Sequence, residues 1–166
     1  MTKPTAATVA TLATAPASPA ENSRRRRWLA VLARASRAEL EAGLLLAGTL
    51  PTIETVRPPE VGMTMLRGRV GGTGDAFNLG EASLTRCALR FAGGALGVGY
   101  TLGRDRRKAE LVAVFDALLQ DPSHSETLWR NVVEPLQLAQ QARVEAASRA
   151  AASSKVDFFT LVRGEA

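Results

Sequence analysis

The 166-residue chain contains a single cysteine, Cys87, and a single histidine, His124. One cysteine excludes an internal disulfide framework and suits a reducing cytosol. A structural zinc site draws four ligands mainly from cysteine and histidine, so no metal site is expected. No apolar run approaches the roughly 20 residues that cross a bilayer. We therefore predict a cytoplasmic protein that has no contact with a membrane.

Lysine is absent between Lys3 and Lys108, and this absence limits which phosphate-binding motif the glycine-rich segment GGTGDAFNLGEASLTR at residues 71–86 can form. A Walker loop needs lysine followed by serine or threonine after its last glycine. The dinucleotide fingerprint needs a third glycine, and Phe77 stands in that place. A wide turn between two strands explains the glycines better than a phosphate loop. A backbone nest that binds an oxyanion remains the alternative.

The chain also lacks a constellation for nucleophilic catalysis. Cys87 falls in the middle of an expected strand, and His124, the sole candidate base, begins a helix far along the chain. Acidic pairs such as Asp75 and Glu81 exist, but nothing in the sequence fixes their separation. No catalytic residue is predicted.

Positive charge is plentiful: the net charge is +5, and four arginines stand together at residues 24–27. This favours acidic partners without selecting one. The arginine cluster either solvates a helix end or binds nucleic acid or a membrane, which makes a basic nucleic-acid-binding module the alternative function. Aromatic residues form only 5% of the chain, and Tyr100 alone falls on an expected strand surface, which disfavours base stacking.

Hydrophobic periodicity predicts an α+β fold in one domain over residues 24–166, after a disordered low-complexity leader at residues 1–23. The leader is rich in threonine, alanine and proline. A first helix follows the arginines, and Ser36 with Glu39 forms a capping box for a second helix that ends near Gly48. An antiparallel sheet of about four strands is then expected at TIETVR, GMTMLRGRV, SLTRCALRF and ALGVGYTL.

The last two of these strands are expected to join through a tight turn at residues 92–94. In the final strand, Gly97 and Gly99 share one face with Thr101. Glycine weakens a strand, so two glycines on one face predict that something packs closely against it. That something is either a helix of the same chain or another subunit.

Asp105 is predicted to cap the next helix, whose basic start GRDRRK is the best candidate anion site in the chain. A further capping box at Ser123 and Glu126 opens a long helix that Pro135 should kink or divide. The remainder, residues 136–166, is expected to form an exposed helical arm with an extended tail, SKVDFFTLVRG. This apolar tail is expected to dock either on the chain's own core or on a partner.

Three segments together resemble the PhnG family of the bacterial carbon–phosphorus lyase system: RVGGTGDAFNLGEASLTR, GRDRRKAE and SKVDFFTLVRG. Their order and spacing match, as does the helix beginning RRWLAVLA. The resemblance spans roughly residues 24–165. Each segment alone is weak evidence, but three in register are specific.

The resemblance implies assembly, with no catalysis by the chain alone. PhnG-type proteins work with PhnI, PhnH and PhnL as α-D-ribose 1-methylphosphonate 5-triphosphate synthase, in which an alkylphosphonate displaces adenine from ATP. The nucleosidase-like chemistry is attributed mainly to PhnI. PhnG, PhnH, PhnI and the radical enzyme PhnJ form a core complex that later cleaves the carbon–phosphorus bond. The implied substrates of the complex are MgATP and alkylphosphonate, and no cofactor is expected on this chain alone.

The motif-bearing residues and the two strand glycines are therefore the candidate contacts with other subunits: Gly71, Gly72, Gly74, Arg86, Gly97, Gly99, Phe158, Phe159 and Arg163. Arg104 and Asp105 are candidates to support substrate phosphates near a shared site. An independent phosphate-binding enzyme built on residues 71–86 is a third hypothesis, but the sequence supplies it with no base or nucleophile.

Overall fold

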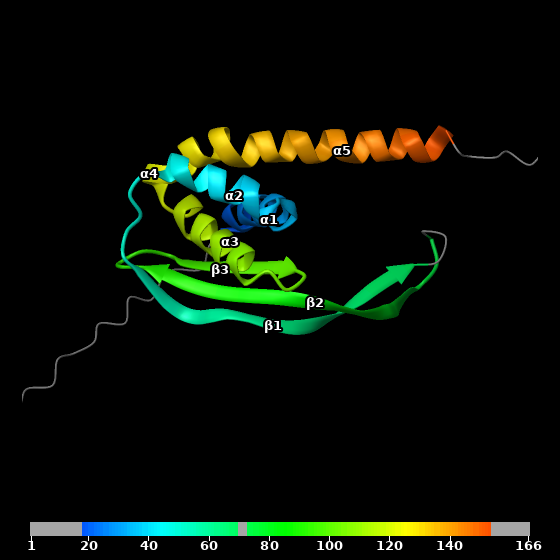
Figure 1. The fold of residues 1–166 in the computed structure, drawn as a ribbon, viewed down its shortest axis with the longest axis horizontal. Helices are drawn as coiled ribbons and strands as arrows, with labels where there is room; N and C mark the ends of the chain where they lie inside the picture. Colours follow the sequence, from blue (N-terminus) through cyan, green and yellow to red (C-terminus); the bar gives the residue numbers. More distant parts are fainter. Residues whose placement is uncertain (1–17, 70–72, 154–166) are drawn as a thin grey trace, which may run out of the picture.

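Helices cover one face of a three-stranded antiparallel sheet in the computed structural model, which describes residues 18–69 and 73–153 (Figure 1). The α+β class predicted from the sequence is confirmed. The strands are β1 (Ile53–Arg69), β2 (Ala76–Phe91) and β3 (Leu96–Leu102). The helical elements are α1 (Pro19–Arg34), α2 (Arg37–Leu44), the 3₁₀ turn η1 (Leu45–Ala47), α3 (Arg106–Leu119), α4 (Pro122–Leu128), the π-helical turn η3 (Trp129–Val133) and α5 (Glu134–Ser153).

The prediction of about four strands was slightly wrong, because the first two expected strands are one. β1 runs without a break through Pro58 and Pro59, with register shifts against β2 on either side of Arg57. Proline is tolerated in an edge strand, where its missing N–H is not needed for pairing. β1 is such an edge, since the strand order is β1-β2-β3. The register shifts let β1 continue where the sequence alone predicted that one strand would end and another begin.

The sheet is much longer on its β1–β2 side than on its β3 side. β1 pairs with β2 almost from end to end, whereas β3 pairs only with the stretch Leu84 to Arg90 of β2. The remaining parts of β1 and β2 project past α1, α2 and α3 as a two-stranded hairpin (Figure 1). We call residues 60–69 and 76–83 the β1–β2 ribbon.

Helix α3 is the centre of the core. Every residue of α3 from Leu111 to Leu119 is buried, which is expected of a helix covered on all sides. One side of α3 lies on the sheet, where alternate residues of β2 point inward, and the other side meets α1, α2 and α4. The inward-pointing residues of β2 are Thr85, Cys87, Leu89 and Phe91.

The N-terminal helices begin at capping boxes. α1 begins at Pro19, inside the predicted leader, because Ser18 and Glu21 cap each other's backbone N–H groups. The earlier leader residues lie outside the described part of the chain. The predicted box of Ser36 and Glu39 is confirmed for α2, and the turn after that helix ends at Gly48, whose φ of 70° favours glycine.

Glu39 also joins two distant helices. Its carboxylate accepts hydrogen bonds from the backbone N–H and hydroxyl of Ser36, at 2.7 and 2.9 Å, and from Arg143 on α5. The Ser36 backbone donor, followed by Arg143, lowers the pKa of Glu39 to about 2. The folded state therefore favours the charged carboxylate.

Replacing Glu39 with glutamine is expected to reduce stability by about 1 kcal/mol at pH 7, through loss of a charged cap and an ion pair. Because the pKa is depressed on folding, this contribution is complete above the unfolded pKa of 4.5 and is lost as pH falls towards 2. Urea unfolding at pH 7, 4 and 3 should show the two proteins converging. Glu145→Gln, on the exposed end of α5, is the control; a difference for Glu39→Gln that does not vary with pH would contradict the assignment.

The C-terminal helical region departs from its predicted start but divides where expected. The N-cap of α4 is Asp121, with Pro122 at the first helical position, so the predicted capping box of Ser123 and Glu126 is wrong. The predicted division at Pro135 is confirmed by η3, in which the N–H of Glu134 donates to the carbonyl of Trp129. This wider turn accommodates the proline ring, which would collide with a carbonyl in a regular α-helix.

Helix α5 continues as an exposed arm, as predicted, with Leu136 its one buried residue. It runs above the other helices and in the same direction as the ribbon (Figure 1). Among the described residues, no helix combines the length and apolar character required to span a bilayer.

Candidate functional site

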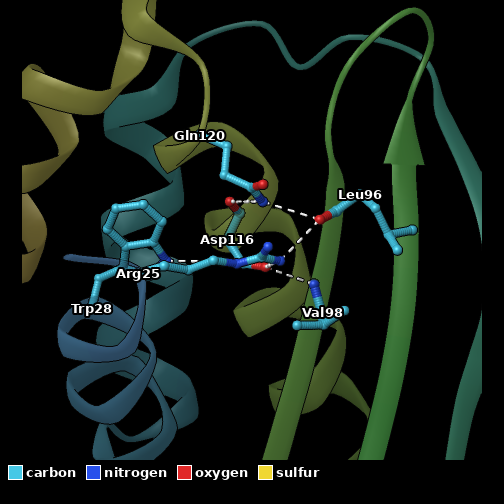
Figure 2. A network of polar contacts seen from close by, with 6 residues as sticks. All are labelled: Arg25, Trp28, Leu96, Val98, Asp116 and Gln120. Atoms are coloured by element: carbon cyan, nitrogen blue, oxygen red, sulfur yellow. Dashed lines mark hydrogen bonds and ion pairs between the residues drawn. The ribbon is translucent and has the colours of Figure 1, made fainter. Parts of the chain in front are cut away.

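The most highly connected polar group in the described chain is the carboxylate of Asp116, on the buried helix α3 (Figure 2). Its two oxygens accept from Nε and Nη2 of Arg25, at 3.1 and 2.6 Å. Trp28 Nε1 and the backbone N–H of Val98 each donate to it at 2.9 Å. A fully buried carboxylate is costly unless it is paired in this way.

This network joins α1, α3 and β3, and it also closes part of the sheet edge. The carbonyl of Leu96 accepts from Arg25 Nη2 and from Gln120 Nε2, beside the occupied N–H of Val98 (Figure 2). These are backbone groups that an added strand would need. Asp116 is therefore engaged in holding the fold together, and its oxygens are not available for acid–base chemistry.

Gly97 and Gly99, predicted at a subunit contact, instead face helix α3 of the same chain. A Cβ on Gly97 would lie 2.0 Å from the carbonyl oxygen of Ala113, and one on Gly99 would lie 2.0 Å from that of Ala109. Both glycines are buried. The prediction that these glycines contact another subunit is therefore wrong. Something does pack closely against them, as expected, and it is helix α3 of the same chain.

Arg86 lies on the opposite face of the sheet, which the helices leave uncovered (Figure 1). Its guanidinium donates to Glu60 on β1 at 2.6 Å, and Glu60 also accepts from Arg57 at 2.9 Å. The hydrogen bond from Arg86, reinforced by both positive charges, lowers the pKa of Glu60. Tyr100 is the β3 neighbour of Arg86 in register and is half exposed. The predicted contact role of Arg86 thus falls on an accessible surface.

The glycine segment follows a strand that pairs with the next one in antiparallel fashion, as the wide-turn interpretation predicted. Arg69 ends β1 and pairs with Ala76, the first residue of β2, and Arg69 also donates to the carbonyl of Gly74. Two antiparallel strands flank the turn, whereas a phosphate loop links a strand to a helix. Gly71 and Gly72 lie outside the described residues, so their predicted contacts stay predictions.

Asp105 and Arg104 stand at the start of α3, on the exposed surface. The carboxylate of Asp105 accepts from the N–H of Lys108 at 2.9 Å, which confirms the predicted cap. That cap accounts for Asp105 without a ligand and places a negative charge where a phosphate would bind. A phosphate role for either residue stays a prediction.

The groups that could have formed a nucleophilic site are separated and locally engaged. Burial raises the pKa of the Cys87 thiol to about 11, and Glu110 adds to the shift, so the reactive thiolate is suppressed. His124 contacts Ser123 and Asp121 through the same ring nitrogen, Nδ1. A catalytic triad uses both ring nitrogens. The contacts among Asp121, Ser123 and His124 belong to the capped first turn of α4.

No group of three or more metal-ligating side chains occurs within residues 18–69 and 73–153. The tail residues Phe158, Phe159 and Arg163 lie beyond the described chain, and their predicted contacts are untested. The structure thus places Arg86 on the exposed face of the sheet and Gly74, which is half-buried, in the turn before β2, and it removes Gly97 and Gly99 from the set of candidate contacts.

The sequence model of the phosphonate metabolism protein PhnG matches residues 23–164. The chain belongs to the PhnG family. It is 42% identical over 147 residues to the α-D-ribose 1-methylphosphonate 5-triphosphate synthase subunit PhnG of Rhizobium meliloti (strain 1021), covering 86% of this chain and 91% of that protein.

The PhnG match includes both the ribbon and the start of α3, the two described regions that carry the motifs. The described residues of the PhnG motif at residues 69–86 supply the end of β1, most of β2 and the arginine at the base of the projecting hairpin.

Proposed function

We propose that this chain is a subunit of α-D-ribose 1-methylphosphonate 5-triphosphate synthase and acts in phosphonate catabolism. The observation that carries the proposal is the 42% identity to a synthase subunit, which extends over 86% of this chain and 91% of the relative. Agreement over nearly the whole of both chains supports a shared role, and not only a shared fold.

Within the synthase, we assign the chain a supporting role in the displacement of adenine from ATP by an alkylphosphonate. PhnI, PhnH and PhnL are its proposed partners in this step, with PhnJ joining the carbon–phosphorus lyase core complex. MgATP is a substrate of the assembly. The engagement of Asp116 by four protein donors and the raised pKa of Cys87 support a structural contribution over a bond-making one.

Adenine release from MgATP and methylphosphonate tests this function. The purified chain alone is expected to release no adenine, and the partner subunits lacking it should lose at least 100-fold of the activity of the full assembly. Adding the chain back should restore the rate. Adenine release by the isolated chain, or full activity of the assembly without it, would contradict the proposal.

The alternative of a nucleic-acid-binding module is weakened by how the arginine cluster is used. Arg25 is committed to Asp116, and the guanidinium groups of Arg24 and Arg27 lie over the ring of Trp129, 5.4 and 5.5 Å from its centre. These arginines are held against the fold, whereas a phosphate-binding patch needs them free to reach outward.

A further inference from the structure

The β1–β2 ribbon exposes apolar side chains on the face that continues the helix-covered side of the sheet. Val61 is opposite the inward-pointing Thr85, so Val61, Met63 and Met65 alternate along this inner face. They are 38 to 67% exposed, because α1, α2 and α3 stop short of the ribbon and α5 extends in the same direction but lies apart from it (Figure 1).

The outer face of the ribbon is apolar as well. Leu66 and Phe77 lie on it, and Leu79 occupies the register shift between the two strands. A Cβ on Gly68 would lie 2.1 Å from Leu79 Cδ1, so the leucine side chain lies over the glycine on this outer face. The exposed fractions of these three side chains are 42 to 64%.

Each face of the ribbon thus exposes three apolar side chains, although Ser83 and Glu81 also lie on the inner face, and burying these apolar side chains needs cover on both faces. Two strands without a packed layer are marginally stable in water, and contiguous exposed apolar surface marks an interaction site. One flat surface laid against the ribbon would leave the other face in water. The same holds for the ribbon of a second copy laid face to face, which would cover one side of each.

The charges of the ribbon further limit the occupant. The ribbon carries two arginines, at 67 and 69, against two acidic residues, Glu60 and Glu81, so its net charge is zero. Nucleic acid and anionic membranes both require a basic surface. At the base, Arg57 and Arg86 both pair with Glu60, so these two arginines share a single acidic side chain.

We infer that the ribbon inserts into an apolar cleft of another protein subunit, whose walls cover both of its faces and whose rim carries an acidic residue opposite Arg57 and Arg86. This inference rests on the proposed function, since the related chain is named as a synthase subunit. It assigns the described part of the PhnG glycine motif a place inside a partner.

Co-purification of the other synthase subunits with the tagged full-length chain tests the insertion. Met63→Asp changes the inner face and Leu79→Asp the outer face, and each should reduce partner recovery at least tenfold. Leu45→Asp is the matched control, because Leu45 is 83% exposed and lies in η1, away from the ribbon. Loss of recovery with only one of the two ribbon variants would overturn the two-sided cleft.

Cysteine labelling provides a second readout that does not depend on weakening the complex. Met63→Cys and Leu79→Cys should react with maleimide in the isolated chain and become at least tenfold slower in the assembly. The native Cys87 is buried and adds no background. Protection of either position in the isolated monomer would overturn the inference in favour of the chain's own residues 154–166. Protection that appears with self-association would instead identify a second copy.

The outcomes separate this inference from the proposed function. Normal adenine release with unprotected ribbon positions would overturn the docking mode and leave the synthase role intact. Failure of the wild-type chain to support adenine release would overturn the synthase role itself, and the inference with it.

Discussion

Replacing Asp116 with alanine is expected to lower the free energy of unfolding by about 3–5 kcal/mol, enough to unfold many domains of this size. The substitution leaves the Arg25 guanidinium, the Trp28 indole N–H and the Val98 backbone N–H without their shared acceptor. It also opens a cavity next to the most buried helix of the fold. Urea or guanidinium unfolding, followed by the fluorescence of the two tryptophans, Trp28 and Trp129, measures the loss directly.

The matched control for Asp116→Ala is Glu110→Ala on the same helix. Glu110 forms an exposed ion pair with Arg107, and such pairs contribute about 0–1 kcal/mol. Asp116→Asn is also expected to destabilise, because its amide NH₂ would face N–H donors. A change of less than 1 kcal/mol for Asp116→Ala would show that the network does not hold the fold together.

The second large effect is expected from a single added methyl group on β3. Gly99→Ala should destabilise the chain by about 3 kcal/mol, because the new Cβ would meet the backbone oxygen of Ala109, which cannot move without shifting α3 off the sheet. Gly97→Ala should behave in the same way against Ala113. Thermal and denaturant unfolding of the two variants would measure the cost.

Gly62→Ala separates this steric effect from the general effect of replacing a strand glycine. A Cβ on Gly62, in β1, would have no heavy atom within 4 Å among its described surroundings. That variant should stay within about 0.5 kcal/mol of wild type, or gain slightly from reduced unfolded-state entropy. Equal losses at Gly62 and Gly99 would rule out a backbone collision as the cause.

Local signals in the sequence were sufficient for the features that depend on a few neighbouring residues. The capping box of Ser36 and Glu39, the cap at Asp105 and the helix division at Pro135 all follow from side-chain chemistry within one or two turns. The turn after residue 69 was predicted because its glycines fail the phosphate-loop patterns and lie between strands.

Features that depend on distant parts of the chain were not predictable in this way. The two β3 glycines required a close neighbour, but the alanine side of α3 that fills this place is known only once the helix has docked. Asp116 interrupts an apolar helix, and that interruption was the one sequence signal of a buried network. Its partners lie as many as 91 residues away, too far for any local pattern to reveal.

The two prolines of β1 led to the wrong prediction of two separate strands, for a different reason. Pro58 and Pro59 ordinarily end a strand, and edge position is decided by the order of strands in the finished sheet. Predicting one strand instead of two would have required knowing that nothing pairs with that side of β1 in the described chain.

The span from Arg25 to Asp116 also has a consequence for the order of events at the ribosome. α1 is synthesised first, but the carboxylate that anchors it follows 91 residues later, and β3 supplies its other contact only shortly before. The N-terminal helix must therefore wait, unanchored, until most of the domain has emerged. Folding of this chain is then a late, concerted event of its synthesis, completed when α3 closes over the glycine face of β3.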